Sequence, residues 1–150
     1  MEGLIRGSLR LFVEARRREY AVAAIGFADR AHLLSRPSCD VARFRSQLST
    51  LEPAGRTAMA QALRLATRRL GRRRGDKVIL LVTDGMPDSR EATLDAARLA
   101  RAQGITVIAV GTGQADEAFL AALTPKPELA AKVELGQLEE TISNAAKVLP

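Results

Sequence analysis

The feature that most constrains this fold is a pair of apolar segments in which polar and apolar residues do not alternate. Residues 77–85 read KVILLVTDG and residues 105–113 read ITVIAVGTG. A strand with one face in water alternates, whereas a strand covered on both faces does not. Residues 89–104 have helical apolar spacing, with Ser89 as a candidate N-cap and Gly104 as a C-terminal stop. This strand–helix–strand pattern predicts a parallel sheet with helices on both faces.

The rest of the chain also alternates helical and strand-like segments, without an internal repeat or a linker. Hydrophobic residues make up 47% of the 150 residues and charged residues 27%, which is the balance of a globular protein with a real core. We therefore predict one doubly wound α/β domain over residues 1–150, with a mostly parallel sheet. Helices are expected at 2–18, 40–51 with Asp40 as N-cap, 57–71, 115–123 and 138–149, and strands at 20–28, 31–37 and 132–135.

Composition also bears on location and partners. The single cysteine, Cys39, excludes an internal disulfide framework and fits a reducing compartment. No apolar run approaches the roughly 20 residues of a membrane span, and the N-terminal segment does not read as a secretory signal. We therefore expect a cytoplasmic protein without a membrane partner. His32 is the only histidine and is expected to be a surface or packing residue.

The net charge of +6 is carried mostly by arginine. The densest basic run is RRLGRRRGDK, at residues 68–77. The favoured interpretation is a solvated surface, and the alternative is binding to nucleic acid or another anionic partner. No aromatic side chain is interleaved in this run for base stacking, so a nucleic-acid partner is not expected.

Polar groups follow the predicted strands at the edge where α/β sheets bind ligands, the carboxyl ends of the strands. Asp84 ends the segment 77–85, and Thr57 opens the helix expected at 57–71. A carboxylate and a hydroxyl both suit magnesium, which takes few protein ligands and keeps its waters. The alternatives stay open: Asp84 and Gly85 also form a common turn pair, and Thr57 also suits a helix N-cap.

The order and spacing of four segments resemble the von Willebrand factor type A domain. The resemblance covers nearly all of residues 2–149. The second and third strands of that family are similar to the segment YAVAAIGFADRAHLLSRPS of this chain. The family's strand that ends in Thr-Asp-Gly is similar to KVILLVTDGMPDS. LEPAGRTAMAQALRLA resembles the Gly-x-Thr segment that opens a helix, and AQGITVIAVGTG resembles the next helix-to-strand step.

The resemblance implies a metal-dependent docking module that is not an enzyme. In the family, a divalent ion, usually magnesium, is held by an Asp-x-Ser-x-Ser loop after the first strand, by a threonine and by an aspartate. The matching positions here are Thr57 and Asp84, and an acidic side chain of the partner would complete the shell of the ion. Residues expected on the partner-binding rim are Gly55, Arg56, Gly85 and Asp88.

The sequence departs from the family pattern at its beginning, because it contains no Asp-x-Ser-x-Ser. Met1, Glu2 and Gly3 resemble the residues just after that motif, so the first strand and its loop are expected to be absent. The coding start could lie upstream, the flanking strands could pair directly, or another chain or a second copy could supply a strand. In the last two cases Thr57 and Asp84 are too few to hold magnesium tightly.

Several functions follow from these patterns. The leading hypothesis is a bacterial-type protein–protein interaction module, since similar stand-alone domains often work beside an AAA+ ATPase. The alternative is a metal-independent scaffold or assembly subunit that associates through helices or an exposed strand edge, including as a homo-oligomer. Enzymatic activity is not expected, because no base, nucleophile or complete ligand set is evident. The Gly-x-Gly of residues 111–116 lacks the third glycine of a dinucleotide loop.

Overall fold

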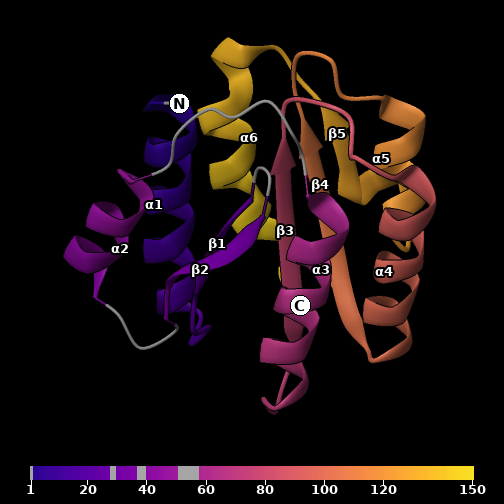
Figure 1. Cartoon of the computed structure of the whole chain (residues 1–150). Helices are drawn as coiled ribbons and strands as arrows, with labels where there is room; N and C mark the ends of the chain where they lie inside the picture. Colours follow the sequence, from indigo (N-terminus) through magenta and orange to yellow (C-terminus); the bar gives the residue numbers. More distant parts are fainter. Residues whose placement is uncertain (1, 28–29, 37–39, 51–57) are drawn as a thin grey trace.

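A computed structural model describes residues 2–27, 30–36, 40–50 and 58–150 (Figure 1). The helices are α1 (Glu2–Arg17), α2 (Val41–Leu48), α3 (Met59–Gly71), α4 (Arg90–Ala102), α5 (Glu117–Leu123) and α6 (Leu138–Asn144). The strands are β1 (Ala24–Phe27), β2 (Ala31–Ser35), β3 (Lys77–Thr83), β4 (Ile105–Gly111) and β5 (Ala130–Lys132). Short 3-10 turns occupy Pro127–Leu129, Leu135–Gln137 and Ala145–Val148.

The helix boundaries follow the capping residues that the sequence offers. The Asp40 side chain accepts a hydrogen bond from the Arg43 N–H at 2.8 Å, which begins α2. The Ser89 side chain accepts one from the Ala92 N–H at 3.1 Å, which begins α4. Gly104 follows the end of α4 with φ +78°, a conformation that L side chains rarely adopt. The predicted caps at Asp40 and Ser89 and the stop at Gly104 are confirmed.

The main sheet is parallel and has the order β3-β4-β5. β3 and β4 pair in register from Lys77 opposite Ile105 to Thr83 opposite Gly111, which confirms the predicted strand–helix–strand unit. The expected strand at 132–135 is wrong in position, because β5 ends at Lys132. The next residues form a 3-10 turn with a capping box between Glu134 and Gln137, which removes them from the sheet.

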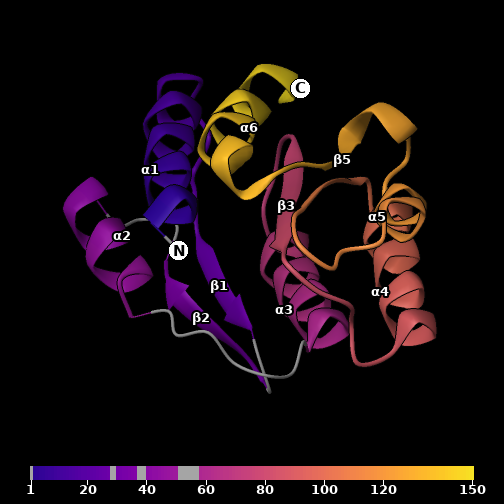
Figure 2. The same ribbon diagram turned by 90° about the horizontal axis from the view of Figure 1, so that it is seen from above.

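Helices cover both faces of the main sheet, which confirms the doubly wound α/β class (Figure 2). On one face, α3, α4 and α5 pack against β3 and β4 in the largest core cluster, which includes Met59, Leu63, Ala97, Val107 and Leu123. On the other face, Leu138 and Ile142 of α6 pack against Val110 of β4, with Leu4 and Leu11 of α1 beside them. The helix expected at 138–149 is shorter than predicted, since α6 passes into a 3-10 turn at Ala145.

β1 and β2 form a separate antiparallel hairpin that is not hydrogen-bonded to the main sheet. Direct pairing of the segments 20–28 and 77–85, one of the arrangements considered from the sequence, does not occur between the described strands β1 and β3. The two parts are joined by helices and side chains instead. Phe27 of β1 packs against the core cluster of α3 and β3, and α1 lies along α6.

The contact between α1 and α6 depends on a buried glycine. Gly7 faces the start of α6, and a Cβ placed on it would lie 2.8 Å from the Glu139 carbonyl oxygen and 3.0 Å from the Ile142 Cβ. A side chain therefore cannot be added without separating the two helices. Arg6 lies 3.2 Å from the Glu139 carboxylate and Arg10 lies 3.5 Å from it, so ion pairs bridge the same contact.

Candidate docking site at the carboxyl end of the sheet

β3 ends in a short turn that places Asp84 at the surface. The Gly85 N–H lies 3.3 Å from the Thr83 Oγ1, which is the hydrogen-bond geometry of a side-chain-closed turn. Thr83 itself is buried, whereas Asp84 is exposed. The apolar strand thus stops at a buried hydroxyl, and the next residue carries a carboxylate into solvent.

The backbone of Asp84 is held by the loop that follows β4. The Thr112 N–H donates to the Thr83 carbonyl at 3.0 Å, and the Gln114 N–H donates to the Asp84 carbonyl at 3.0 Å. Gly113, between these donors, has φ +62°, and a Cβ on it would lie 3.0 Å from the Asp84 carbonyl oxygen. The close approach and the positive φ both require glycine here. Asp84 is therefore carried on a backbone that two neighbouring strands hold in place.

A second acidic group lies on the same side of the fold. Asp116 caps α5, accepting from the Ala118 N–H at 3.0 Å, and its carboxylate lies 2.7 Å from the Arg90 guanidinium of α4. The hydrogen bond from Arg90 holds the pKa of the Asp116 carboxyl below its ordinary value, while desolvation acts in the opposite direction and backbone N–H groups add to the lowering. The Arg90 guanidinium also lies 5.2 Å from the centre of the Phe119 ring. Asp116 is thus already paired within the chain.

The structure tests only part of the predicted site. Asp84, Gly85 and Asp88 lie together in the turn after β3, with Asp84 and Asp88 exposed and Gly85 half-buried. The other predicted residues, Gly55, Arg56 and Thr57, lie outside the described residues, so the predicted pairing of Thr57 with Asp84 stays a prediction.

The described residues do not by themselves fit a tightly bound magnesium ion. No group of three or more His, Cys, Asp or Glu side chains that could hold a metal occurs in the part of the chain that the structure describes. Magnesium needs near-ideal octahedral geometry, and a lone carboxylate leaves nearly all of its positions to water. Asp84 is accordingly a single candidate ligand rather than a metal centre.

Sequence reasoning missed two features of this edge. The first is the contact of the loop after β4 with the Asp84 carbonyl, which accepts from the Gln114 N–H and lies close to Gly113. The available signal was the Gly-Thr-Gly at the end of an apolar strand. The ion pair between Arg90 and Asp116 joins residues 26 positions apart, and no local pattern points to it.

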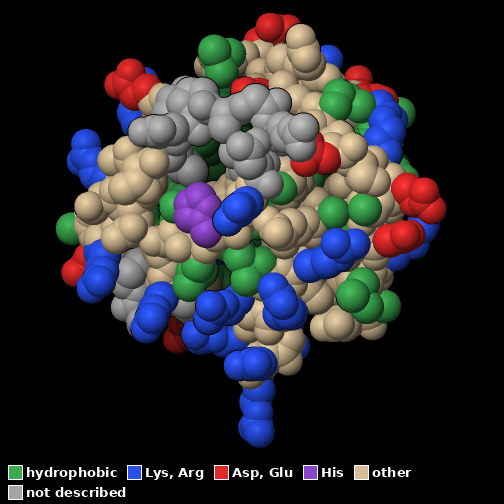
Figure 3. Space-filling model, viewed as in Figure 1, with side chains coloured by type: hydrophobic (Ala, Val, Ile, Leu, Met, Phe, Trp, Pro, Cys, Tyr) green, Lys and Arg blue, Asp and Glu red, His purple; other side chains and the backbone are tan. Residues whose placement is uncertain are grey.

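A group of exposed arginines lies away from this edge. Arg64, Arg68, Arg69, Arg72 and Arg73 are exposed along α3 and just beyond its end. Figure 3 shows blue side chains grouped over the lower part of the molecule, where α3 ends in Figure 1. Cations near the C-terminus of a helix are favoured by its dipole, so this grouping has a structural reason apart from any partner.

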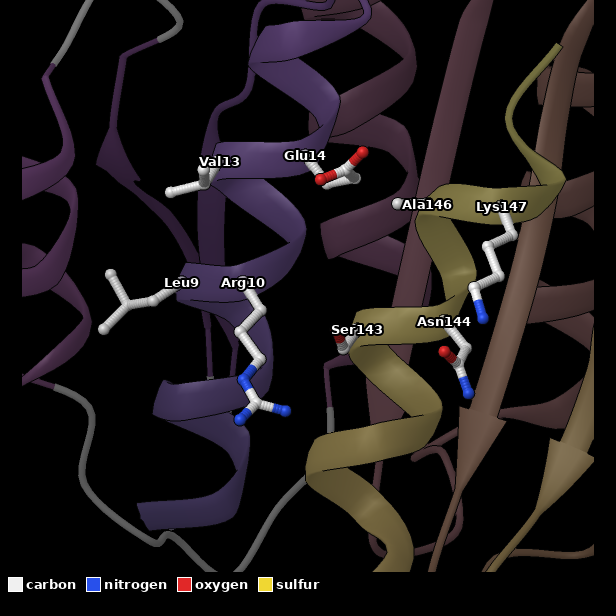
Figure 4. A pocket seen from close by; sticks show the side chains of 8 residues that line it. All are labelled: Leu9, Arg10, Val13, Glu14, Ser143, Asn144, Ala146 and Lys147. Atoms are coloured by element: carbon white, nitrogen blue, oxygen red, sulfur yellow. The ribbon is translucent and has the colours of Figure 1, made fainter.

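A surface pocket of about 510 Å³ lies between α1 and α6, and none of its lining residues comes from the turn after β3 (Figure 4). It is lined by Leu9, Arg10, Val13, Glu14, Ser143, Asn144, Ala146 and Lys147. Apolar groups of α1 meet amide, hydroxyl and ammonium groups from the end of α6 and the turn after it.

The chain belongs to the von Willebrand factor type A family, whose profile matches residues 10–144. Thrombospondin-related anonymous protein of Plasmodium falciparum is 34% identical over 74 residues, which is 47% of this chain and 13% of that protein. No helix in the described residues is long and apolar enough to cross a membrane.

Solved structures share the fold at low identity. The pilus adhesin SpaC of Lactobacillus rhamnosus GG superposes with a TM-score of 0.83 at 16% identity, over 97% of this chain and 27% of that one. Manganese-loaded TRAP protein of Plasmodium vivax superposes with a TM-score of 0.75 at 19% identity, over 92% of this chain and 63% of that one. The chain thus spans only part of the proteins that it matches.

Proposed function

We propose that this domain is a protein–protein interaction module that docks its partner at the carboxyl end of the main sheet. The observation that carries the proposal is the exposed Asp84, whose backbone is held by β3 and by the loop after β4. Binding groups work best on rigid elements, because little ordering is needed when the partner arrives. Gly85 and Asp88 form the described part of the rim, and Gly55 and Arg56 complete it in the proposal.

The relatives support binding rather than catalysis. One matching structure is a pilus adhesin, and another is a TRAP protein loaded with manganese. In this proposal a divalent ion, Mg²⁺ in the cell, binds weakly through Thr57 and Asp84 and supplies positive charge for an acidic side chain of the partner. Two oxygen ligands leave most of the ion's shell to water, so the affinity expected for the ion alone is low.

The metal part is tested by thermal unfolding of the chain and of Asp84→Ala with and without Mg²⁺ or Mn²⁺. An ion present at about ten times its Kd stabilises the folded state by about 1.4 kcal/mol, a rise in Tm of about 3–6 °C for a chain of this size. Asp84→Ala should abolish the rise. Asp95→Ala is the matched control, because Asp95 is also exposed but lies on α4 and pairs with Arg98 at 2.8 Å. An equal rise in Tm in both variants would show that Asp84 is not a ligand of the ion.

The docking part is tested separately, by affinity capture from the source cells with the chain, Asp84→Asn and Asp95→Asn as baits. The proposal predicts that a protein recovered with the chain and with Asp95→Asn is lost with Asp84→Asn. Its identity also tests the proposed AAA+ ATPase partner and the proposed cytoplasmic location. Equal recovery with both variants would show that the partner does not dock at this edge.

A second candidate function is a metal-independent scaffold or assembly subunit. The observation that favours it is the division of the sheet, since β1 pairs only with β2 and β3 only with β4 among the described strands. Exposed strand edges are templates for pairing with another chain. In this case the sedimentation coefficient should rise with protein concentration and should not respond to Asp84→Ala or to divalent ions.

A further inference from the structure

The exposed side of α3 carries a row of arginines without an acidic partner. Figure 3 shows blue side chains grouped over the end of this helix. In the part of the chain that the structure describes, the ion pairs all involve other residues. We call this group the α3 arginine face, and its members are Arg64, Arg68, Arg69, Arg72 and Arg73, the last two just beyond the helix.

The arginines of the neighbouring helix α4 differ, because each has a partner within the chain. The Arg98 guanidinium lies 2.8 Å from the Asp95 carboxylate, and Arg101 donates to the Thr124 carbonyl at 2.8 Å. Arg90 pairs with Asp116, as described above. α3 has no acidic residue of its own. Pairing of arginines within the chain is thus usual on the helix beside α3 and absent from the α3 arginine face.

The stability of α3 does not account for all of these charges. Arg64 and Arg68 are four residues apart, as are Arg68 and Arg72, and like charges at this spacing destabilise a helix. The helix dipole favours cations in the last turn, which holds Arg68 and Arg69. It does not favour Arg64, which lies one turn earlier. The charges therefore point to a binding partner outside the chain.

The neighbouring helix limits the width of the basic surface on one side. A Cβ on Gly71 would lie 3.4 Å from the Gln103 side-chain oxygen, so the ends of α3 and α4 lie together. α4 exposes Glu91 and Asp95, which repel a wide polyanion such as a nucleic-acid duplex. Residues 58–77 also contain no aromatic side chain on which a base could stack. A single acidic polypeptide segment lying along α3 avoids both difficulties.

The spacing of the arginines defines the chemistry of such a segment. Residues four apart on a helix are separated by about 6 Å along its axis, which is the interval between Arg64, Arg68 and Arg72. Carboxylates recur at about this interval on every fourth residue of a helix and on every second residue of an extended chain. A guanidinium group can hold each carboxylate through two parallel hydrogen bonds.

We propose that the α3 arginine face docks an acidic polypeptide segment of a partner, with Asp or Glu at one of these two spacings. The face lies at the amino end of the main sheet, where α3 leads into β3. Asp84 lies at the carboxyl end of β3, about 20 Å away along the strand. Docking at the arginine face requires no metal ion. The two surfaces can therefore bind different partners at once, and either proposal can fail without the other.

The test measures the fluorescence anisotropy of a labelled peptide of alternating glutamate and serine as the chain is added, in EDTA and about 0.1 M salt. EDTA removes divalent ions, so metal-dependent docking at Asp84 cannot contribute. Arg64→Gln and Arg68→Gln together should weaken binding about 5- to 30-fold, the loss of two exposed ion pairs. Glutamine and arginine have similar helix propensities, so α3 should stay folded.

The matched control is Arg43→Gln together with Arg45→Gln. These arginines are also exposed, but they lie on α2, which packs against α1 and β2. The control removes the same charge from the chain, and it should change the affinity for the peptide by less than about twofold, because distant charges are screened.

Four results would overturn the proposal. The first is no measurable binding of the peptide to the chain. The second is equal weakening in both double variants, which would show that only the net charge matters. The third is equal or tighter binding of an oligothymidylate of the same charge, lost with the same two arginines, which would assign the face to nucleic acid. The fourth is a fall in Tm for Arg64→Gln with Arg68→Gln, since removal of like-charge repulsion predicts an unchanged or higher Tm.

Discussion

The most direct test of the packing is a pair of glycine substitutions one turn apart on α1. Gly3 and Gly7 both face Glu139 of α6, but at different distances. A Cβ on Gly3 would have its nearest neighbour at 3.9 Å, an ordinary contact, whereas a Cβ on Gly7 would lie 2.8 Å from the Glu139 carbonyl oxygen. The same chemical change therefore makes an ordinary van der Waals contact in one case and a steric clash with backbone in the other.

The two variants should shift stability in opposite directions. Replacing glycine by alanine within a helix stabilises by about 0.5–1 kcal/mol, so Gly3→Ala should gain up to about that amount. Gly7→Ala has the same gain, but overpacking at a close contact costs about 1–3 kcal/mol. We expect a net loss of about 1–2 kcal/mol for Gly7→Ala, since Glu139 contributes rigid backbone rather than a flexible side chain at this contact.

The assay is urea unfolding followed by far-UV circular dichroism, because the chain has no tryptophan and one tyrosine. For a chain of this size, about 2 kcal/mol between the variants corresponds to about 4–8 °C in Tm. Unchanged m-values would show that stability rather than denatured-state compactness has changed. If Gly7→Ala were as stable as Gly3→Ala, α1 would not lie against α6 at the described distance.

Two further predictions concern the carboxyl end of the sheet. Gly113→Ala should destabilise the fold by about 1–3 kcal/mol, the range for a strained left-handed backbone. The loss should exceed that of Gly75→Ala, because Gly75 also has positive φ but has nothing within 4 Å of its Cβ. Equal losses of Tm in the two variants would show that the close contact with the Asp84 carbonyl has no effect on stability. Because the pKa of Asp116 is lowered in the folded state, its contribution to stability is present above the unfolded pKa of about 4 and is lost as pH falls through the folded value. Asp116→Asn and Arg90→Gln should both weaken the fall in stability measured by urea unfolding between about pH 5 and pH 2, and an unchanged slope in either variant would contradict the pairing.

The features that sequence reasoning predicted well are local or strongly apolar. β3 and β4 were predictable because neither segment alternates, and α4 because Ser89 and Gly104 mark its ends by short-range chemistry. Asp84 at the end of β3 followed from the same pattern. The strand expected at 132–135 was misplaced. β5 has only three residues, none of them β-branched or aromatic, so strand propensity does not indicate its position.

The features that sequence reasoning missed depend on contacts between distant residues. Tertiary packing determines that Gly7 fits against Glu139 and that Arg90 pairs with Asp116. The residue type alone does not indicate which partner a glycine or an arginine will contact. The separation of the hairpin β1–β2 from the main sheet was not predicted either. The hairpin stays with the fold through side chains of β1, α1 and α3 rather than by pairing with β3.

The division of the sheet has a mechanical consequence for the domain. A pull applied between the Asp84 edge and the hairpin crosses no backbone ladder between β1 and β3 in the described chain. It is borne by apolar contacts, by the ion pairs of Glu139 with Arg6 and Arg10, and by side-chain hydrogen bonds such as the one from the Ala31 N–H of β2 to Gln61 of α3. Apolar contacts are non-directional, so they yield by sliding rather than by the simultaneous rupture of a hydrogen-bonded ladder. The α1–α6 interface and the contacts of the hairpin with α3 therefore share the load under which the two parts of this domain would separate.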